Sequence, residues 1–370
     1  MRILLGGIPL GCDNIGDEAI IACVVKMLKG RLPGATIAVA TADPATARRL
    51  DVEVVPAYGF AGVPVDGFTD VARCYDAYIW CGATGLSDYP HVALDLLEAT
   101  QSVGVRTFVW GVGMDDELNP VFFKAHGFRR RILSALGLVG LYERRLRAKL
   151  ARRIAAILPR CRGVWLRDPQ SAAMLASMGF AGAKVAADTA ILLDSPHDAS
   201  GGPRKRTLGL CISTQRQVAD LGGVERLIAA VRESGADVLG IPMNPKTDRA
   251  LLERLGVECI EGTEPGDVAE AAARCSVVLS SRLHLLILAA NVGTPILGIA
   301  RGSKLANWLD NFGRTVEGSV YDCDWQVVTR HVLEALESRG DWDSVRAAAY
   351  ERLNSRLSVA LSELVAQLGA

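Results

Sequence analysis

Short apolar runs rich in Val, Ile and Leu alternate along the chain with Ala-, Leu- and Arg-rich stretches of helical spacing. This alternation is typical of parallel β-sheets covered by helices, because strands buried on both faces are apolar throughout. Helices are expected between the strands, including residues 18–32 and 171–178. In the first half of the chain the pattern predicts strands at residues 2–5, 36–40, 77–81, 106–111, 163–166 and 184–186.

The alternation lapses at the turn-forming run SPHDASGGP, residues 195–203, and then resumes. Further strands are predicted at residues 207–213, 236–241, 277–280 and 295–299, and helices at 224–234, 246–255, 267–275, 283–291 and 304–312. The sequence therefore predicts an α/β protein of two doubly wound, Rossmann-like domains facing a cleft, where strand ends would place a ligand. We assign an N-terminal domain, a linker, a C-terminal domain and C-terminal helices to residues 1–195, 196–204, 205–324 and 325–370.

Composition narrows the class of protein. With 370 residues, half of them apolar, the chain is too long for one hydrophobic core. Lys plus Arg and Asp plus Glu both number 41, so no net field would draw the protein to nucleic acid. The nine cysteines form no C-x-x-C pair and no zinc-like spacing, so we expect free thiols in a reducing cytosol and no metal site. The pattern favours no particular oligomeric state.

The amino-terminal run MRILLGGIPLGC is predicted to be a first strand rather than a signal peptide, because Gly and Pro interrupt its short apolar stretch. No run reaches the ~20 apolar residues of a membrane-spanning helix. The turn that follows, GCDNIGDEAI, leads into a helix and carries Asn14 and Asp17. These polar groups either cap the helix or face a substrate, and both interpretations stay open. The dinucleotide fingerprint is absent from this turn and no G-K-[ST] loop occurs, which disfavours nicotinamide and P-loop enzymes.

Glycines and charges follow two other predicted strands. Gly82, in WCGATGL, would let the backbone approach a ligand closely. Arg167 and Asp168 follow the apolar run GVWL, at the carboxyl end of a strand. The Arg fork suits a carboxylate or a phosphate, although an ion pair that only orders the turn explains the same residues.

The densest polar cluster lies between residues 280 and 313. Ser281, Arg282 and His284 stand where an apolar strand gives way to an apolar helix, and the next strand leads to Lys304. A lone His on an apolar helix is commonly a core residue, but its place beside Arg282 at the helix start favours a functional role.

At these residues the chain resembles the polysaccharide pyruvyl transferase family. The shared motifs are N-x-G-D-E at residues 14–18, R-D at 167–168, R-L-H at 282–284 and the later Lys304, and the resemblance covers roughly residues 2–315. Ala83 and Thr84 stand within a stretch where relatives have a run of glycines, and Thr189 replaces a usual proline. The resemblance implies a glycosyltransferase B (GT-B) type of fold, with the N-terminal domain on the acceptor side and the C-terminal domain on the donor side.

The chemistry that the resemblance implies is metal-independent and needs no cofactor. A pyruvyl group passes from phosphoenolpyruvate, the co-substrate, to two hydroxyls of a sugar in a polysaccharide or a lipid-linked saccharide of the cell envelope. Arg167, Arg282 and Lys304 would hold the two anionic groups of the donor, and His284 would be the general acid. Ser281, Asn14, Asp17 and Gly82 complete the substrate-binding residues that we predict.

Two other functions remain open: a GT-B glycosyltransferase that uses a nucleotide-activated sugar, and a non-catalytic protein that binds glycans or phosphate. Residues 124–167 carry thirteen Lys or Arg against one acid, Glu143. We predict that this segment forms a helical basic surface that meets an anionic membrane or a lipid-linked acceptor, with the protein in the cytoplasm at the inner face of the membrane. An ordinary solvated helix is the alternative.

Overall fold

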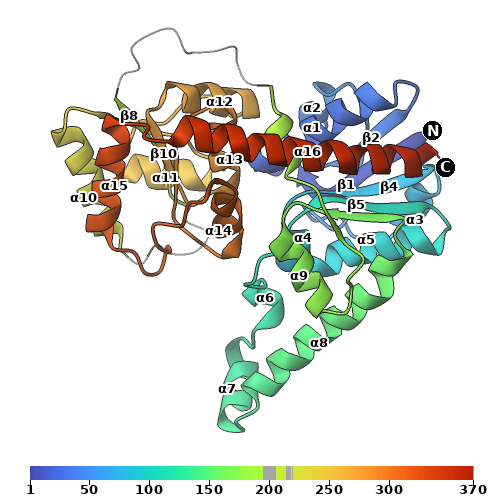
Figure 1. Cartoon of the computed structure of the whole chain (residues 1–370). Helices are drawn as coiled ribbons and strands as arrows, with labels where there is room; N and C mark the ends of the chain where they lie inside the picture. Colours follow the sequence, from blue (N-terminus) through green and yellow to red (C-terminus); the bar gives the residue numbers. More distant parts are fainter. Residues whose placement is uncertain (195–205, 214–217, 219, 370) are drawn as a thin grey trace. The chain divides into compact units, whose positions relative to one another are not determined.

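The computed structural model describes residues 1–194, 206–213, 218 and 220–369, and the predicted linker 196–204 lies outside these ranges. The chain divides into two compact units (Figure 1). The first unit comprises Met1–Leu10, Val24–Asp188 and Arg356–Ala370, and the second comprises Gly11–Cys23 and Thr189–Ser355. The division differs from the sequence-based boundaries, since an early segment joins the second unit and the carboxyl terminus joins the first.

The first unit is built on a seven-stranded parallel sheet of order β3-β2-β1-β4-β5-β6-β7. The strands are β1 Arg2–Leu10, β2 Thr36–Thr41, β3 Glu53–Pro56, β4 Ala77–Cys81, β5 Arg106–Val112, β6 Gly163–Leu166 and β7 Lys184–Val185. All six predicted strands are present. The missed strand, β3, lies at the sheet edge and is largely exposed, so its four residues lack the apolar run of a buried strand.

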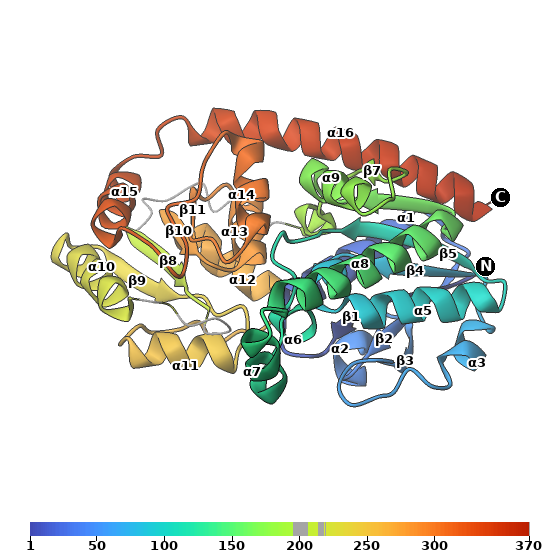
Figure 2. The ribbon, with the colours of Figure 1, turned by 90° about the horizontal axis from the view of Figure 1, so that it is seen from below.

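Helices cover this sheet on both faces (Figure 2). The helices between its strands are α1 Ile15–Arg31, α2 Pro44–Arg48, α3 Phe68–Ala72, α4 Gly85–Asp88, α5 Pro90–Ser102, α6 Pro120–Phe123, α7 Gly127–Ala135, α8 Val139–Ile157 and α9 Pro169–Ser177. Of these, α7 lies away from the sheet and has no buried residue. The first turns of α1 belong to the second unit and the rest of the helix to the first. The core gathers large side chains such as Tyr78, Trp80 and Phe68 between sheet and helices. Burial of this apolar area is the main force that holds the layers together.

The second unit has a four-stranded parallel sheet of order β11-β10-β8-β9. Its strands are β8 Thr207–Cys211, β9 Asp237–Gly240, β10 Val277–Ser280 and β11 Ile296–Gly298. Its helices are α10 Leu221–Glu233, α11 Thr247–Arg254, α12 Pro265–Arg274, α13 Leu283–Asn291, α14 Ser303–Leu309 and α15 Trp325–Glu337, with 3-10 turns at Thr189–Leu192 and Asp310–Phe312. Each predicted strand and helix of this half has a counterpart, most of them within three residues at each end.

The predicted helical segment 325–368 is two helices, α15 and α16 Trp342–Gly369. They are separated near Gly340, whose φ of 55° lies in the left-handed region that glycine tolerates best. In the described part of the chain, no helix combines the length and the apolar character needed to cross a bilayer.

Each sheet contains one point where the strand order reverses. In the first sheet the chain moves outward from β1 to β3 and then returns to β4 on the other side of β1. In the second sheet the same reversal places β10 beside β8. In doubly wound sheets, ligands bind outside the carboxyl ends of the strands at such a reversal.

Candidate functional site

The reversal point of the second sheet is held together by buried serines. Ser213 follows β8, and Ser281 follows β10. The backbone N–H of Ser213 donates to Oγ of Ser281 at 2.8 Å. Nη1 of Arg301 lies 3.4 Å from Oγ of Ser213. Ser281 is fully buried, and its hydroxyl connects the ends of β8 and β10 through the hydrogen bond from Ser213. Its predicted contact with a substrate is untested.

Arg282 occupies the position just before helix α13. Its Nε donates to Oδ2 of Asp248 at 3.0 Å, and its Nη2 donates to Oδ1 at 2.7 Å. This two-pronged pair fixes the plane and direction of the guanidinium. The backbone N–H of Arg282 also donates to Oγ of Ser280 at 2.8 Å, which fixes the entry into the helix.

Asp248, the partner of Arg282, is not among the site residues predicted from the sequence. Its side chain is 0% exposed, and its Oδ2 also accepts from the backbone N–H of Asn244 at 3.0 Å. The thiol of Cys211 lies 3.6 Å from the same oxygen, and burial together with this carboxylate raises the pKa of Cys211 well above its ordinary value. Along the chain Asp248 is an acid in the first turn of a helix, a place where capping is the ordinary explanation. No local signal separates it from such a cap.

His284 is the second residue of α13 and is half-buried. The amino-terminal end of α1 lies against its ring, since a Cβ added at Gly16 would come within 2.3 Å of Nδ1 of His284. The backbone N–H of Ile15 donates to the carbonyl of Met243 at 3.1 Å and ties this end of α1 to the loop after β9. Glycine at position 16 is therefore what lets the helix approach the imidazole.

Asn14 and Asp17 shape the start of α1. Oδ1 of Asn14 accepts from the backbone N–H of Gly16 at 3.2 Å, and its Nδ2 donates to Oδ2 of Asp17 at 2.7 Å. Both residues thus organise the helix start, while their predicted substrate contacts are untested. Next to them, Asp13 forms an ion pair of 2.6 Å with Nζ of Lys246, and this pairing raises the pKa of Lys246.

Lys304 lies in the first turn of α14, which packs against α13. The second unit thus carries six of the eight predicted site residues: Asn14, Asp17, Ser281, Arg282, His284 and Lys304. The sequence-distant turn at the start of α1 and the R-L-H motif belong to one compact unit.

Arg167 belongs to the first unit and directly follows β6. Its side chain is 5% exposed and lies 3.3 Å from Asp168 and 3.6 Å from Asp188. A Cβ added at Gly113 would come within 2.3 Å of its Nε, so glycine leaves room for the guanidinium. Oδ1 of Asp168 also caps helix α9 by accepting from the backbone N–H of Ser171 at 2.7 Å. The Arg167–Asp168 ion pair, which was one of the two interpretations of the sequence, is thus present. A donor-binding role for Arg167 stays a prediction.

Gly82 lies at the reversal point of the first sheet, directly after β4. It has a φ of 55°, and Ala83 follows with a φ of 56°. The N–H of Gly82 donates to the carbonyl of Trp110, and the N–H of Gly113 donates to the carbonyl of Ala83 at 2.8 Å. A left-handed conformation costs an alanine roughly 1–2 kcal/mol. The Ala83 substitution in the glycine run therefore sits at a strained position, where a glycine would be relaxed.

Within the described ranges, no three His, Cys, Asp or Glu side chains gather as metal ligands. Independence from metals and cofactors stays a prediction.

Comparisons with solved structures identify the architecture. The chain is similar to the UDP-GlcNAc 2-epimerase from Neisseria meningitidis bound to UDP-GlcNAc, with a TM-score of 0.59 at 11% identity, covering 99% of this chain and 100% of that one. It is also similar to a UGT transferase from Siraitia grosvenorii in complex with UDP, with a TM-score of 0.60 at 10% identity over 100% and 99% of the two chains. These similarities confirm the predicted α/β fold of GT-B type, and at such identities they show the fold alone.

A comparison with curated proteins found no significant match. The family model for polysaccharide pyruvyl transferase, in contrast, matches residues 14–303. The match includes the helix start at Asn14, the Arg167 turn and the Arg282–His284 motif, and it extends over most of the chain. The protein belongs to the polysaccharide pyruvyl transferase family.

Proposed function

We propose that this protein transfers the pyruvyl group of phosphoenolpyruvate to a sugar of a polysaccharide or a lipid-linked saccharide and forms a pyruvyl ketal. Its family is one of transferases, which supports an enzyme. The observation that carries the proposal is the start of α13, where Arg282 is held by the buried Asp248 and His284 follows two residues later. A fixed cation and an imidazole at the positive end of a helix suit an anionic donor.

The proposed reaction has three steps. His284 gives a proton to the methylene carbon of phosphoenolpyruvate, and a cationic centre forms at the carbon that bears the phosphate. A sugar hydroxyl attacks this carbon and loses its proton, and the carbon–oxygen bond to phosphate breaks. A second hydroxyl then adds and closes the cyclic ketal. Of the two protons that the hydroxyls lose, one restores His284 and the other goes to the departing phosphate. The products are one ketal and one inorganic phosphate.

In this proposal Arg282 and Lys304 bind the phosphate and carboxylate of the donor before reaction. Arg167 can contribute only through atoms that its two carboxylate neighbours leave available. We place the reaction in the cytoplasm, at the inner face of the membrane.

A donor screen tests the reaction class. Release of inorganic phosphate from phosphoenolpyruvate in the presence of saccharide acceptors supports the proposal. Release of a nucleotide from a nucleotide-sugar supports the second candidate, a glycosyltransferase, which is favoured by the UDP and UDP-sugar ligands of structurally similar proteins. Binding of phosphate or glycan without any turnover supports a non-catalytic protein.

His284→Ala tests the assignment of the acid. Loss of a positioned acid should lower turnover by roughly a hundredfold or more, while phosphoenolpyruvate binding, measured by calorimetry, survives. Arg282→Ala should weaken both binding and rate, because it removes a charge that holds the donor before reaction. His331→Ala, in α15 of the same unit, is the control and should retain turnover. Near-normal turnover in folded His284→Ala protein would exclude His284 as the acid.

A further inference from the structure

The tip formed by helix α7 and the first half of α8, residues 127–147, exposes an unusual amount of apolar surface. Helix α7 has no buried residue. Phe128 is 77% exposed and Leu136 is 62% exposed. The large exposed apolar side chains of the tip are Phe128, Ile132, Leu136, Leu138 and Leu141. Single exposed apolar residues are ordinary, but five within fourteen positions form a patch that marks an interaction surface.

The tip lies away from the body of the first unit. Figure 1 shows α8 running from the helices beside the sheet out to α7 at its far end. The buried residues of α8 are Leu150, Ile154 and Ile157, all in its carboxyl-terminal half. The carboxyl-terminal half therefore anchors the helix, and the tip contributes little to the core of its unit.

The spacing on α7 makes one apolar face. Phe128, Ile132 and Leu136 recur every four residues, so they line one side of the helix and its carboxyl end. Arg131 flanks this face, whereas Arg130 lies on the opposite side of the helix. The predicted basic segment 124–167 is thus helical in its middle, but its last residues form the buried strand β6 and the buried Arg167 and do not contribute to the surface.

Positive charge surrounds the apolar patch. The tip has six exposed arginines and one acid, Glu143. Oε1 of Glu143 accepts from the backbone N–H of Ala125, so the acid is engaged at the base of α7. Nη1 of Arg129 donates to the hydroxyl of Tyr142 at 2.9 Å, which links the two helices. The arginines are Arg129, Arg130, Arg131, Arg144, Arg145 and Arg147.

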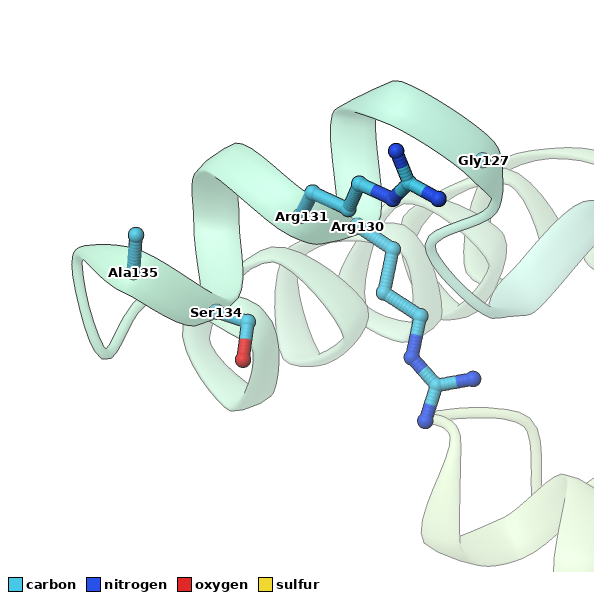
Figure 3. A pocket seen from close by; sticks show the side chains of 5 residues that line it. All are labelled: Gly127, Arg130, Arg131, Ser134 and Ala135. Carbon is cyan, nitrogen blue, oxygen red and sulfur yellow. The ribbon is translucent and has the colours of Figure 1, made fainter.

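A shallow recess of about 480 Å³ on α7 is lined by Gly127, Arg130, Arg131, Ser134 and Ala135. Figure 3 shows that the two guanidinium groups point in different directions and do not converge on one position. The recess therefore lacks the geometry of a specific anion site. What remains is a diffuse positive field around an exposed apolar face.

We propose that the α7–α8 tip docks on an anionic lipid bilayer, with Phe128, Ile132 and Leu136 inserted at the interface and the arginines among the lipid headgroups. An amphipathic basic helix that lies in the interface combines these two features, because apolar burial and charge attraction add. A solvated helix would not need the apolar face. The proposal is independent of the reaction, so its test does not depend on the donor or the acceptor.

Vesicle flotation of the full chain tests the proposal. We expect binding to phosphatidylcholine vesicles that contain phosphatidylglycerol, much weaker binding to phosphatidylcholine alone, and loss of binding as salt rises. Phe128→Ser should lower the apparent affinity about tenfold, since it removes an inserted aromatic side chain. Arg131→Gln should lower it on the order of fivefold, the effect of one basic residue near the surface, whereas Arg130→Gln, on the opposite side of the helix, should lower it less.

Matched controls separate docking from general damage. Val359→Ser removes an apolar side chain that is 61% exposed on α16, and Arg330→Gln removes an exposed arginine from α15. Both should bind vesicles as the parent protein does. No binding to anionic vesicles at low salt overturns the proposal, as does binding that Phe128→Ser leaves unchanged. A Phe128-dependent dimer in lipid-free buffer, with no vesicle binding, would instead assign the patch to a second copy of the chain.

Discussion

Among single side chains, Arg282 shows how a largely buried charge is kept in place. The guanidinium is mostly buried, and removing it from water is unfavourable unless a partner compensates. Asp248 supplies that compensation with two hydrogen bonds and is itself satisfied by a backbone N–H. The pair therefore both stabilises the second unit and orients the cation at the start of α13.

Substitution of Asp248 tests this positioning role. Asp248→Asn keeps the size of the side chain but removes the charge and one of the two acceptors, so we expect the second unit to lose about 1–3 kcal/mol of stability. If the proposed reaction is the right one, the KM for phosphoenolpyruvate should rise more than kcat falls, because Arg282 is still present but less well held. Urea unfolding and steady-state kinetics measure the two effects.

Glu253→Gln is the matched control on the same helix, α11. Glu253 pairs with Arg249 on the surface at 3.7 Å, so its loss should change stability by less than about 0.5 kcal/mol. If Asp248→Asn kept the parent stability and the parent KM, Asp248 would have no positioning role.

Among helices, the close approach of α1 to α13 depends on Gly16, a residue without a side chain. The start of α1 is fixed by the Ile15–Met243 hydrogen bond and by the Asn14 turn, so it cannot easily withdraw from His284. In the family motif N-x-G-D-E, Asn14 thus caps the start of the helix and Gly16 leaves space for the imidazole of His284.

Gly16→Ala is expected to displace the His284 ring, because its Cβ would lie 2.3 Å from Nδ1. We expect turnover to fall by at least about tenfold and stability to fall by about 1–3 kcal/mol, as in other overpacked sites. Gly30→Ala, near the end of the same helix, has nothing within 4 Å of the added Cβ and should leave activity unchanged. Equal activity of the two variants would contradict the proposed contact.

Across the whole chain, the last helix links sequence-distant parts. α16 begins in the second unit, and its last residues belong to the first. There Oε2 of Glu363 accepts from Nε1 of Trp165 at 2.9 Å, and its Oε1 lies 2.9 Å from Nζ of Lys184. Arg106 adds a hydrogen bond of 3.0 Å to the carbonyl of Leu368. These contacts hold the carboxyl terminus on β5, β6 and β7.

Glu363 gives this attachment a pH dependence. The hydrogen bonds from Lys184 and Trp165 lower the pKa of Glu363 in the folded protein. A lowered folded pKa means that the stabilisation is fully present above the unfolded value of about 4.3 and is lost as the pH falls through the folded value. Glu363→Gln should therefore lower the melting temperature slightly at neutral pH, and the difference should shrink in acid. Glu351→Gln, on the same helix, is the control, and an equal effect at both positions would contradict this account.

The sequence by itself determined the fold class, every strand but β3, the helices of the second half with two of the first, and the motifs that identify the family. Strand β4 is apolar at every position and β10 at every position but its last, Ser280, because both strands are buried on both faces, so local composition reports their burial directly. Only the tertiary structure decided which charges meet and which segments share a unit. Asp248 and Arg282 lie 34 positions apart, and Gly16 and His284 are farther apart still. No periodicity encodes such pairs, because they depend on how the chain returns to the same strand ends, which is a property of topology and packing.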